Sequence, residues 1–224
     1  MPYFRPYLKD LHKMDISVHC DVKIFEWLMR RIRSPDDARL DIRSATSVLI
    51  ASEFLGMSTL VQEATAFVAQ HLCEIMALPI DLTCLGDATV RRLARLISLN
   101  TLIGLSDPRN AILGTLYRLR AEELLQNHGP ALTSCKHCSA LYSRRFADRL
   151  ICPRAPASVD FNGRLCQRHE PIADDWDVVR SFIVPMRHRK AQEWKRIFWT
   201  LWGATKLFQC TMCETYFDAG STGG

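Results

Sequence analysis

Two Cys-x-x-Cys pairs restrict how this chain can fold more than any other feature of the sequence. Cys135 and Cys138 form the first pair, Cys210 and Cys213 form the second, and 71 residues separate the pairs. A two-residue spacer lets both sulfurs of one turn reach a single ion, and four thiolates complete the tetrahedral shell that Zn²⁺ prefers. We therefore predict one structural zinc ion that clamps the start of a domain to its end.

Three residues between the pairs are alternative ligands: Cys152, Cys166 and His169. Cys166 and His169 also have ligand spacing, so another combination of the seven candidates, or a second site that includes Cys152, stays open. We rank these sets below the paired cysteines because four thiolates already close one shell. Two interpretations without zinc are free thiols and a redox pair. The redox pair needs its first cysteine at a helix N-terminus, and neither pair precedes a clear amphipathic helix.

Composition predicts a soluble globular chain. Of the 224 residues, 48% are hydrophobic and 24% are charged, which excludes disordered and collagen-like proteins. The longest stretch without Asp, Glu, Lys or Arg is residues 124–135, which is shorter than the roughly 18 residues of a membrane span. The first residues show no secretory signal, so we expect an intracellular chain in which the nine cysteines are thiols or metal ligands.

The charge divides the chain in two. Residues 1–130 carry 15 Lys and Arg against 15 Asp and Glu, whereas residues 131–224 carry 14 against 9, so the second part holds the whole net charge of +5. The division falls at the helix-stop cluster His128-Gly129-Pro130, immediately before the first Cys-x-x-Cys pair. We place a domain boundary there.

The first part is predicted to be helical. We expect a short strand at Ile16 and Val18, then a helix capped by Asp21, because apolar residues follow at helical spacing. Further helices are expected over residues 44–54 and 58–73, with a break at Gly56, and after Asp87 and Asp107. Three more cysteines fall within or beside these patterns, where a free thiol behaves as a small hydrophobic group: Cys20, Cys73 and Cys84.

The second part is predicted to mix strands and helices. Residues 159–163 have the pattern of a strand followed by a tight turn. Residues 187–202 form an amphipathic pattern with one basic face: Arg187, Arg189, Lys190, Lys195 and Arg196. This face is a candidate for contact with nucleic acid or an acidic partner. We favour an ordinary solvated face, because aromatic residues at helical spacing usually belong to the core.

Several segments resemble a known family. PYFRPYL, VKIFEWLMRRI and SVLIASEFLGMSTLVQEATAFVAQHL resemble the later two-thirds of a BTB (POZ) domain. TSCKHCSALYS, DDWDVVRSF and WKRIFWTLWGATKLFQCTMC resemble the C-terminal region of the family of the SANT and BTB domain regulator of class switch recombination. The family's first strands and first helix have no counterpart before Pro2, so we expect an incomplete sheet and a compromised BTB dimer interface.

The resemblance and the patterns together give the expected organisation. The fold class is α+β, mostly α: a partial BTB-like domain over residues 1–78, a helical extension over 79–130, a zinc-stapled α+β domain over 131–218 and a tail over 219–224. The resemblance implies a nuclear, non-enzymatic regulator that self-associates and binds co-repressor proteins. No nucleophile elbow, phosphate loop or His-Glu-x-x-His motif indicates an enzyme. The alternatives are a substrate adaptor for a cullin-type ubiquitin ligase and a nucleic-acid-binding zinc module.

Overall fold

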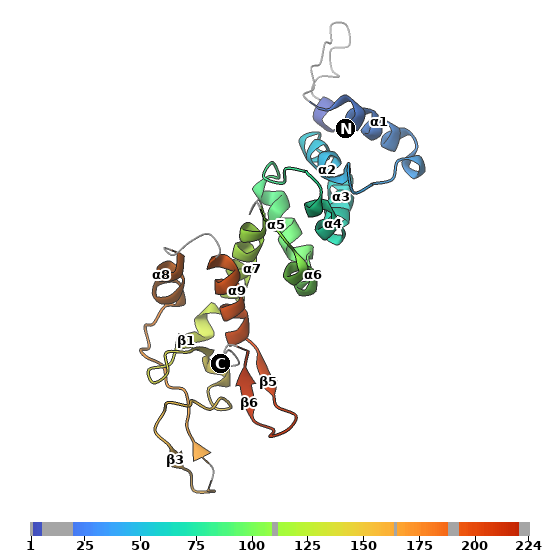
Figure 1. The fold of residues 1–224 in the computed structure, drawn as a ribbon. Helices are drawn as coiled ribbons and strands as arrows, with labels where there is room; N and C mark the ends of the chain where they lie inside the picture. Colours follow the sequence, from blue (N-terminus) through green and yellow to red (C-terminus); the bar gives the residue numbers. More distant parts are fainter. Residues whose placement is uncertain (1, 6–19, 109–111, 164, 188–192, 220–224) are drawn as a thin grey trace. The chain divides into compact units, whose positions relative to one another are not determined.

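The chain divides into two units, residues 1–116 and 117–224 (Figure 1). The computed structural model describes residues 2–5, 20–108, 112–163, 165–187 and 193–219. Helices dominate, and the strands are short and antiparallel, which confirms the predicted α+β, mostly α class. Among the described helices, none is both long and apolar enough to cross a membrane. The finer predicted domain ranges stay predictions.

Among the described residues of the first unit, all regular elements are helices and none is a strand, and loops join the helices. The helices are η1 (Pro2–Phe4), α1 (Val22–Arg33), η3 (Pro35–Asp37), α2 (Ala45–Phe54), α3 (Ser58–Gln70), α4 (Leu72–Ala77), α5 (Asp87–Leu96), α6 (Leu99–Gly104) and the start of α7 (Leu113–His128). The strand predicted at Ile16 and Val18 lies outside the described residues.

Helix α1 begins where the sequence predicts. The carboxylate of Asp21 accepts hydrogen bonds from the backbone N–H groups of Lys23 and Ile24, at 2.8 and 3.2 Å. These bonds satisfy donors that have no partner inside the helix. Leu28 is fully buried on the inner side of α1 and packs in one cluster with residues of α2 and α3.

A sharp turn at Gly56 separates α2 from α3. Gly56 has φ of +67°, a left-handed conformation that favours glycine. The backbone N–H of Met57 donates to the carbonyl of Ser52 at 2.9 Å, which closes the turn. Val48, Leu55 and Leu60 fill the space between the two helices. The predicted break and the helix before it are confirmed, while the helix predicted over 58–73 ends at Gln70 and α4 follows from Leu72.

The second unit combines the rest of α7 with short hairpins and a C-terminal helix. Its elements are η4 (Gly129–Ala131), β1 (Leu132–Ser134), β2 (Leu141–Ser143), η5 (Arg144–Phe146), β3 (Ser158–Val159), β4 (Leu165–Cys166), the π-helical turn η6 (Val179–Ile183), α8 (Val184–Arg187), α9 (Glu193–Ala204), β5 (Leu207–Gln209) and β6 (Tyr216–Asp218). The strands pair β1 with β2, β3 with β4 and β5 with β6, all antiparallel.

Helix α9 supplies much of this unit's core. Ile197, Phe198 and Leu201 are buried, as expected for the apolar face of an amphipathic helix. The ring of Phe198 lies 5.6 Å from that of Tyr117 on α7, centroid to centroid. The predicted helix over 187–202 is confirmed for residues 193–202, while residues 188–192 lie outside the described residues.

Candidate metal centre

The first Cys-x-x-Cys pair lies in the turn of the β1–β2 hairpin. The backbone N–H of Cys135 donates to the carbonyl of Ala140 at 3.0 Å, and the N–H of Ser139 donates to the carbonyl of Cys135 at 2.9 Å. Ser139 has φ of +60°, which reverses the chain directly after Cys138. The turn therefore holds both thiols on one side of a compact knuckle.

Backbone pairing brings two distant residues to this knuckle. The N–H of Cys152 donates to the carbonyl of Gln167 at 2.7 Å, so the segment of Cys152 lies beside the segment that leads to His169. On the other side of His169, the N–H of Lys136 donates to the carbonyl of Glu170 at 2.9 Å. These bonds fix Cys152 and His169 against the first pair.

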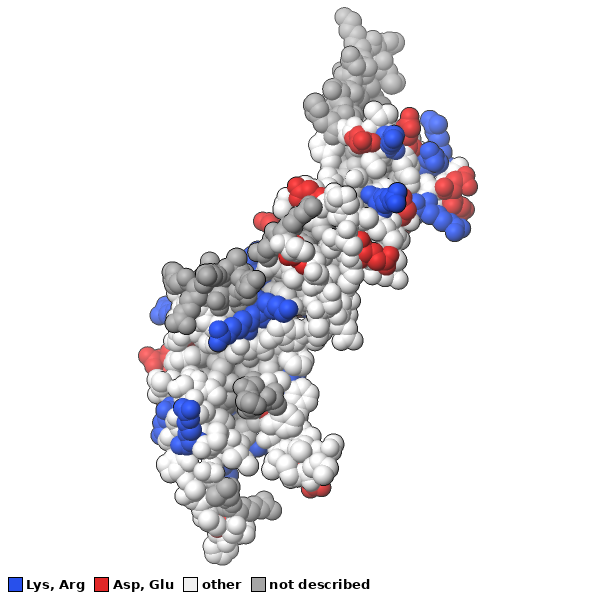
Figure 2. All heavy atoms as spheres, viewed as in Figure 1, with Lys and Arg blue, Asp and Glu red and all other residues white. Residues whose placement is uncertain are grey.

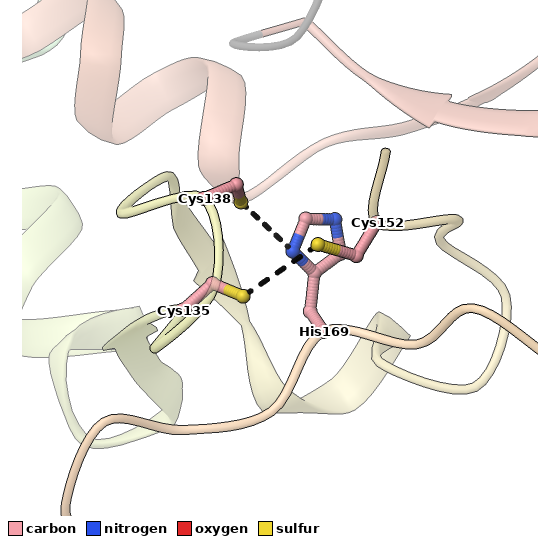
Figure 3. A group of neighbouring side chains, drawn as sticks. All are labelled: Cys135, Cys138, Cys152 and His169. Atoms are coloured by element: carbon pink, nitrogen blue, oxygen red, sulfur yellow. Dashed lines mark hydrogen bonds between the residues drawn. The ribbon is translucent and has the colours of Figure 1, made fainter. Parts of the chain in front are cut away.

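The four side chains point into one common space (Figure 3). The ligand atoms of Cys135, Cys138, Cys152 and His169 all lie within 4.8 Å of one another. The sulfurs of Cys135 and Cys152 are 3.8 Å apart, and Cys138 Sγ is 3.5 Å from His169 Nδ1. Zinc bonds of about 2.3 Å to sulfur and about 2.0 Å to nitrogen give a sulfur–sulfur edge of about 3.8 Å and a sulfur–nitrogen edge of about 3.5 Å in a tetrahedral shell. These two distances match the edges of a zinc shell, and the whole group is compatible with one ion.

The cluster is set in apolar surroundings. Cys135 and Cys152 are fully buried and belong to one core with Tyr142 and Leu150. The ring of Tyr142 packs on the imidazole of His169 with 4.9 Å between centroids. Tyr142 thereby restricts the orientation of the imidazole, which is what a ligand position needs.

Two thiols of the cluster differ in protonation. Burial raises the pKa of Cys135, but hydrogen bonds from the backbone N–H groups of Cys138 and His137 and from His169 outweigh it and lower the pKa to about 6. Burial raises the pKa of Cys138 to about 11, and its hydrogen bond to Cys135 acts in the same direction. The knuckle is therefore prepared to hold a thiolate, the form that binds metals.

The second Cys-x-x-Cys pair lies elsewhere in the second unit. Cys210 and Cys213 occupy the turn of the β5–β6 hairpin. Among the described residues, they join no group of three or more possible ligands. Cys166, on β4, is also not part of the group. The structure therefore groups the first predicted pair with Cys152 and His169, two residues of the alternative set.

The predicted basic face is only partly described. Lys195 and Arg196 on α9 are exposed, and Arg187 ends α8, while Arg189 and Lys190 lie outside the described residues. On the face drawn in Figure 2, Lys and Arg form small separate groups rather than one continuous basic surface.

Spacing alone does not select Cys152 or His169. Cys152 follows the knuckle by 13 intervening residues, and the ligand spacing of His169 is to Cys166, so the pairing of residues 151–152 with 167–168 is what brings Cys152 and His169 together. A local signal does exist for the first pair, since a Cys-x-x-Cys turn between two short strands is typical of a zinc knuckle.

Comparison with known families identifies the N-terminal segment. Residues 1–65 match the model of the family described as "SANT and BTB domain regulator of CSR, BTB domain". This N-terminal segment is similar to the BTB domain of that family. The match spans η1, α1, η3, α2 and the first part of α3, and it confirms the resemblance to a BTB domain within these residues. The resemblance of the C-terminal segments to the same family stays a prediction. We call residues 1–65 the BTB segment. The comparison with solved structures found no match.

Proposed function

We propose that this chain is a non-enzymatic protein-interaction module of a BTB-type nuclear transcription regulator. The observation that carries the proposal is the BTB segment, because domains of this family act through contacts with other proteins and with copies of themselves. Co-repressor proteins are the partners that the resemblance favours. The second unit would extend the binding surface, held in shape by zinc.

The zinc would be structural. Cys135, Cys138, Cys152 and His169 supply four protein ligands, and a closed shell leaves no position for a catalytic water. The chemistry supports this role, since three thiols and one imidazole are a donor set typical of structural zinc. The ion would join the knuckle to the segments that carry Cys152 and His169.

Helix α1 offers a surface for self-association. An apolar stripe with helical spacing runs along it: Val22, Phe25, Met29 and Ile32. Val22 is 71% exposed and Ile32 is 47% exposed, while Phe25 and Met29 are half-buried. Pairing with the same stripe of a second copy would remove these side chains from water.

Sedimentation equilibrium of the full chain tests the proposal. We expect a concentration-dependent dimer that Val22→Asp combined with Ile32→Asp weakens at least tenfold, because a buried carboxylate without a partner is costly. Glu26→Gln, on an exposed position of the same helix, is the matched control and should leave the dimer intact. A chain that stays monomeric at every concentration contradicts self-association through the BTB segment.

A further inference from the structure

The turn of the β5–β6 hairpin repeats the backbone of the first knuckle. The N–H of Cys210 donates to the carbonyl of Thr215 at 2.9 Å, and the N–H of Glu214 donates to the carbonyl of Cys210 at 2.9 Å. Cys135 makes the same two bonds with the residues at the same offsets. Glu214 has φ of +57°, close to the +60° of Ser139. Both turns therefore present two thiols in the same way.

The hairpin holds this turn firmly. Phe208 and Phe217 face each other across β5 and β6, and their rings stack with 5.8 Å between centroids. The ring of Trp202, at the end of α9, lies 6.4 Å from that of Phe208. Cross-strand aromatic pairs of this kind stabilise a two-stranded ribbon. The two thiols are thus positioned before any ion binds.

The second knuckle differs from the first in what surrounds it. Cys135 is buried beside Cys152 and His169, whereas Cys213 is exposed and Met212, at the tip, is 91% exposed. Within the described part of the chain, no third Cys, His, Asp or Glu joins Cys210 and Cys213 at ligand distance. The turn supplies two of the four donors that Zn²⁺ requires and opens them to solvent.

We propose that Cys210 and Cys213 are a zinc half-site that the same two cysteines of a second copy complete. A two-fold axis through the ion gives four thiolates from two identical turns, the arrangement that an isologous dimer produces without any other residue. The turn between Gln209 and Tyr216 carries a single charged residue, Glu214, so two tips can approach with little repulsion. Met212 and Phe208, which is 40% exposed, would become covered.

This inference is independent of the zinc proposed at the first cluster, because the two knuckles share no ligand. It adds a second means of self-association to the one proposed for α1. Each zinc ion at the shared site would displace the thiol protons of four cysteines and involves no oxidation or reduction.

Zinc content and molecular mass of the full chain, purified and then equilibrated with Zn²⁺, test the proposal. The dimer should hold about 1.5 zinc ions per chain, one at the first cluster and half of the shared ion. Cys210→Ser combined with Cys213→Ser should lower this to about 1.0. Cys73→Ser combined with Cys84→Ser is the matched control, since both residues are exposed cysteines outside any ligand group.

The mass measurement is made with Val22→Asp and Ile32→Asp present, so that α1 does not hold the dimer. In this variant, we expect Zn²⁺ to produce a dimer that a chelator dissociates. Adding Cys210→Ser and Cys213→Ser to the variant should abolish this dimer. About two zinc ions per chain in a monomer would overturn the proposal, because the site is then completed within one chain. A zinc content that Cys210→Ser and Cys213→Ser leave unchanged would also overturn it. If the first cluster binds no zinc, the parent holds about 0.5 ion per chain, which supports the shared site alone.

Discussion

Cys135 and Cys152 are fully buried, and their sulfurs lie 3.8 Å apart. We predict that Cys152→Ala removes about one zinc ion per chain and unfolds residues around the first knuckle, because a shell of three ligands binds zinc much more weakly. Zinc analysis of the purified chain measures the loss. Cys166→Ala is the control and should keep the ion, since Cys166 is outside the group. If Cys166→Ala removed the ion and Cys152→Ala kept it, Cys166 would be the ligand in place of Cys152.

Zinc binding at the first cluster should depend on pH. Near neutral pH the raised pKa of Cys138, about 11, keeps its proton in place, so zinc uptake releases at least one proton per ion. Calorimetry in buffers of different ionisation enthalpy measures this number. The affinity should therefore fall by about tenfold or more for each pH unit of acidification.

The pH dependence of the zinc affinity should become steeper at acidic pH. Cys135 has a pKa of about 6, so its thiolate is available to zinc above that pH and is protonated below it. Competition with a chelator should then show one additional proton released per zinc ion as the pH falls through about 6. An affinity that does not change with pH would mean that neither thiol is a ligand.

At the residue level, the sequence predicts those ligands whose position is fixed by local geometry. Cys135 and Cys138 are recognisable because their spacing and their turn are contained in a few residues. Cys152 is a candidate by type and His169 by type and by its spacing from Cys166, but their joint position depends on a hydrogen bond from Cys152 to Gln167, fifteen residues along the chain. The equal spacing of the two pairs made Cys210 and Cys213 the expected partners, and their membership in this shell stays a prediction.

Among the elements, the α2–α3 hairpin depends most on one residue. Gly56→Ala should reduce the free energy of unfolding by about 1–2 kcal/mol, because a residue with a Cβ resists the φ of +67°. The added methyl itself would lie 3.6 Å from the Cβ of Pro2, an ordinary contact, so the cost comes from the backbone. Urea unfolding followed by the helical signal measures the change.

Gly104→Ala is the matched control for the hairpin. Gly104 ends α6, and a Cβ there would meet no atom within 4 Å. Alanine restricts the unfolded chain without straining the helix, so stability should stay unchanged or rise by less than about 1 kcal/mol. Equal losses at both positions would show that the Gly56 conformation does not limit stability.

Element-level prediction succeeds for helices and is weaker for strands. The helices around Gly56 and the one after Asp21 follow from periodicity and capping, which are local. The predicted helix over 58–73 is divided in the structure, since α3 ends at Gln70 and α4 begins at Leu72. Strands of two or three residues, such as β3 and β4, are defined by pairing rather than by pattern.

At the scale of the whole molecule, the two units should respond differently to metal removal. The small core around the first knuckle includes three of the ligands, and its other buried members are Tyr142, Leu150 and Ala155. Without zinc, the buried thiols lose their common partner, and the segments they join are left with short β-pairings and a small apolar cluster. The BTB segment contains none of these ligands, and its helices pack on their own apolar cluster.

We therefore expect a chelator to increase hydrogen exchange of backbone amides in residues 132–143 and 150–172, and to leave α2 and α3 protected, because local opening follows the units that share contacts. Hydrogen exchange measured by mass spectrometry on the full chain, with and without the chelator, reports on the segments around the knuckle and on α2 and α3 in one experiment. Cys135→Ser without chelator is the control, since it removes one ligand and should reproduce the same map. If α2 and α3 lost protection to the same extent, the two units would fold as one. If protection in residues 132–143 stayed unchanged, the metal would not stabilise the second unit.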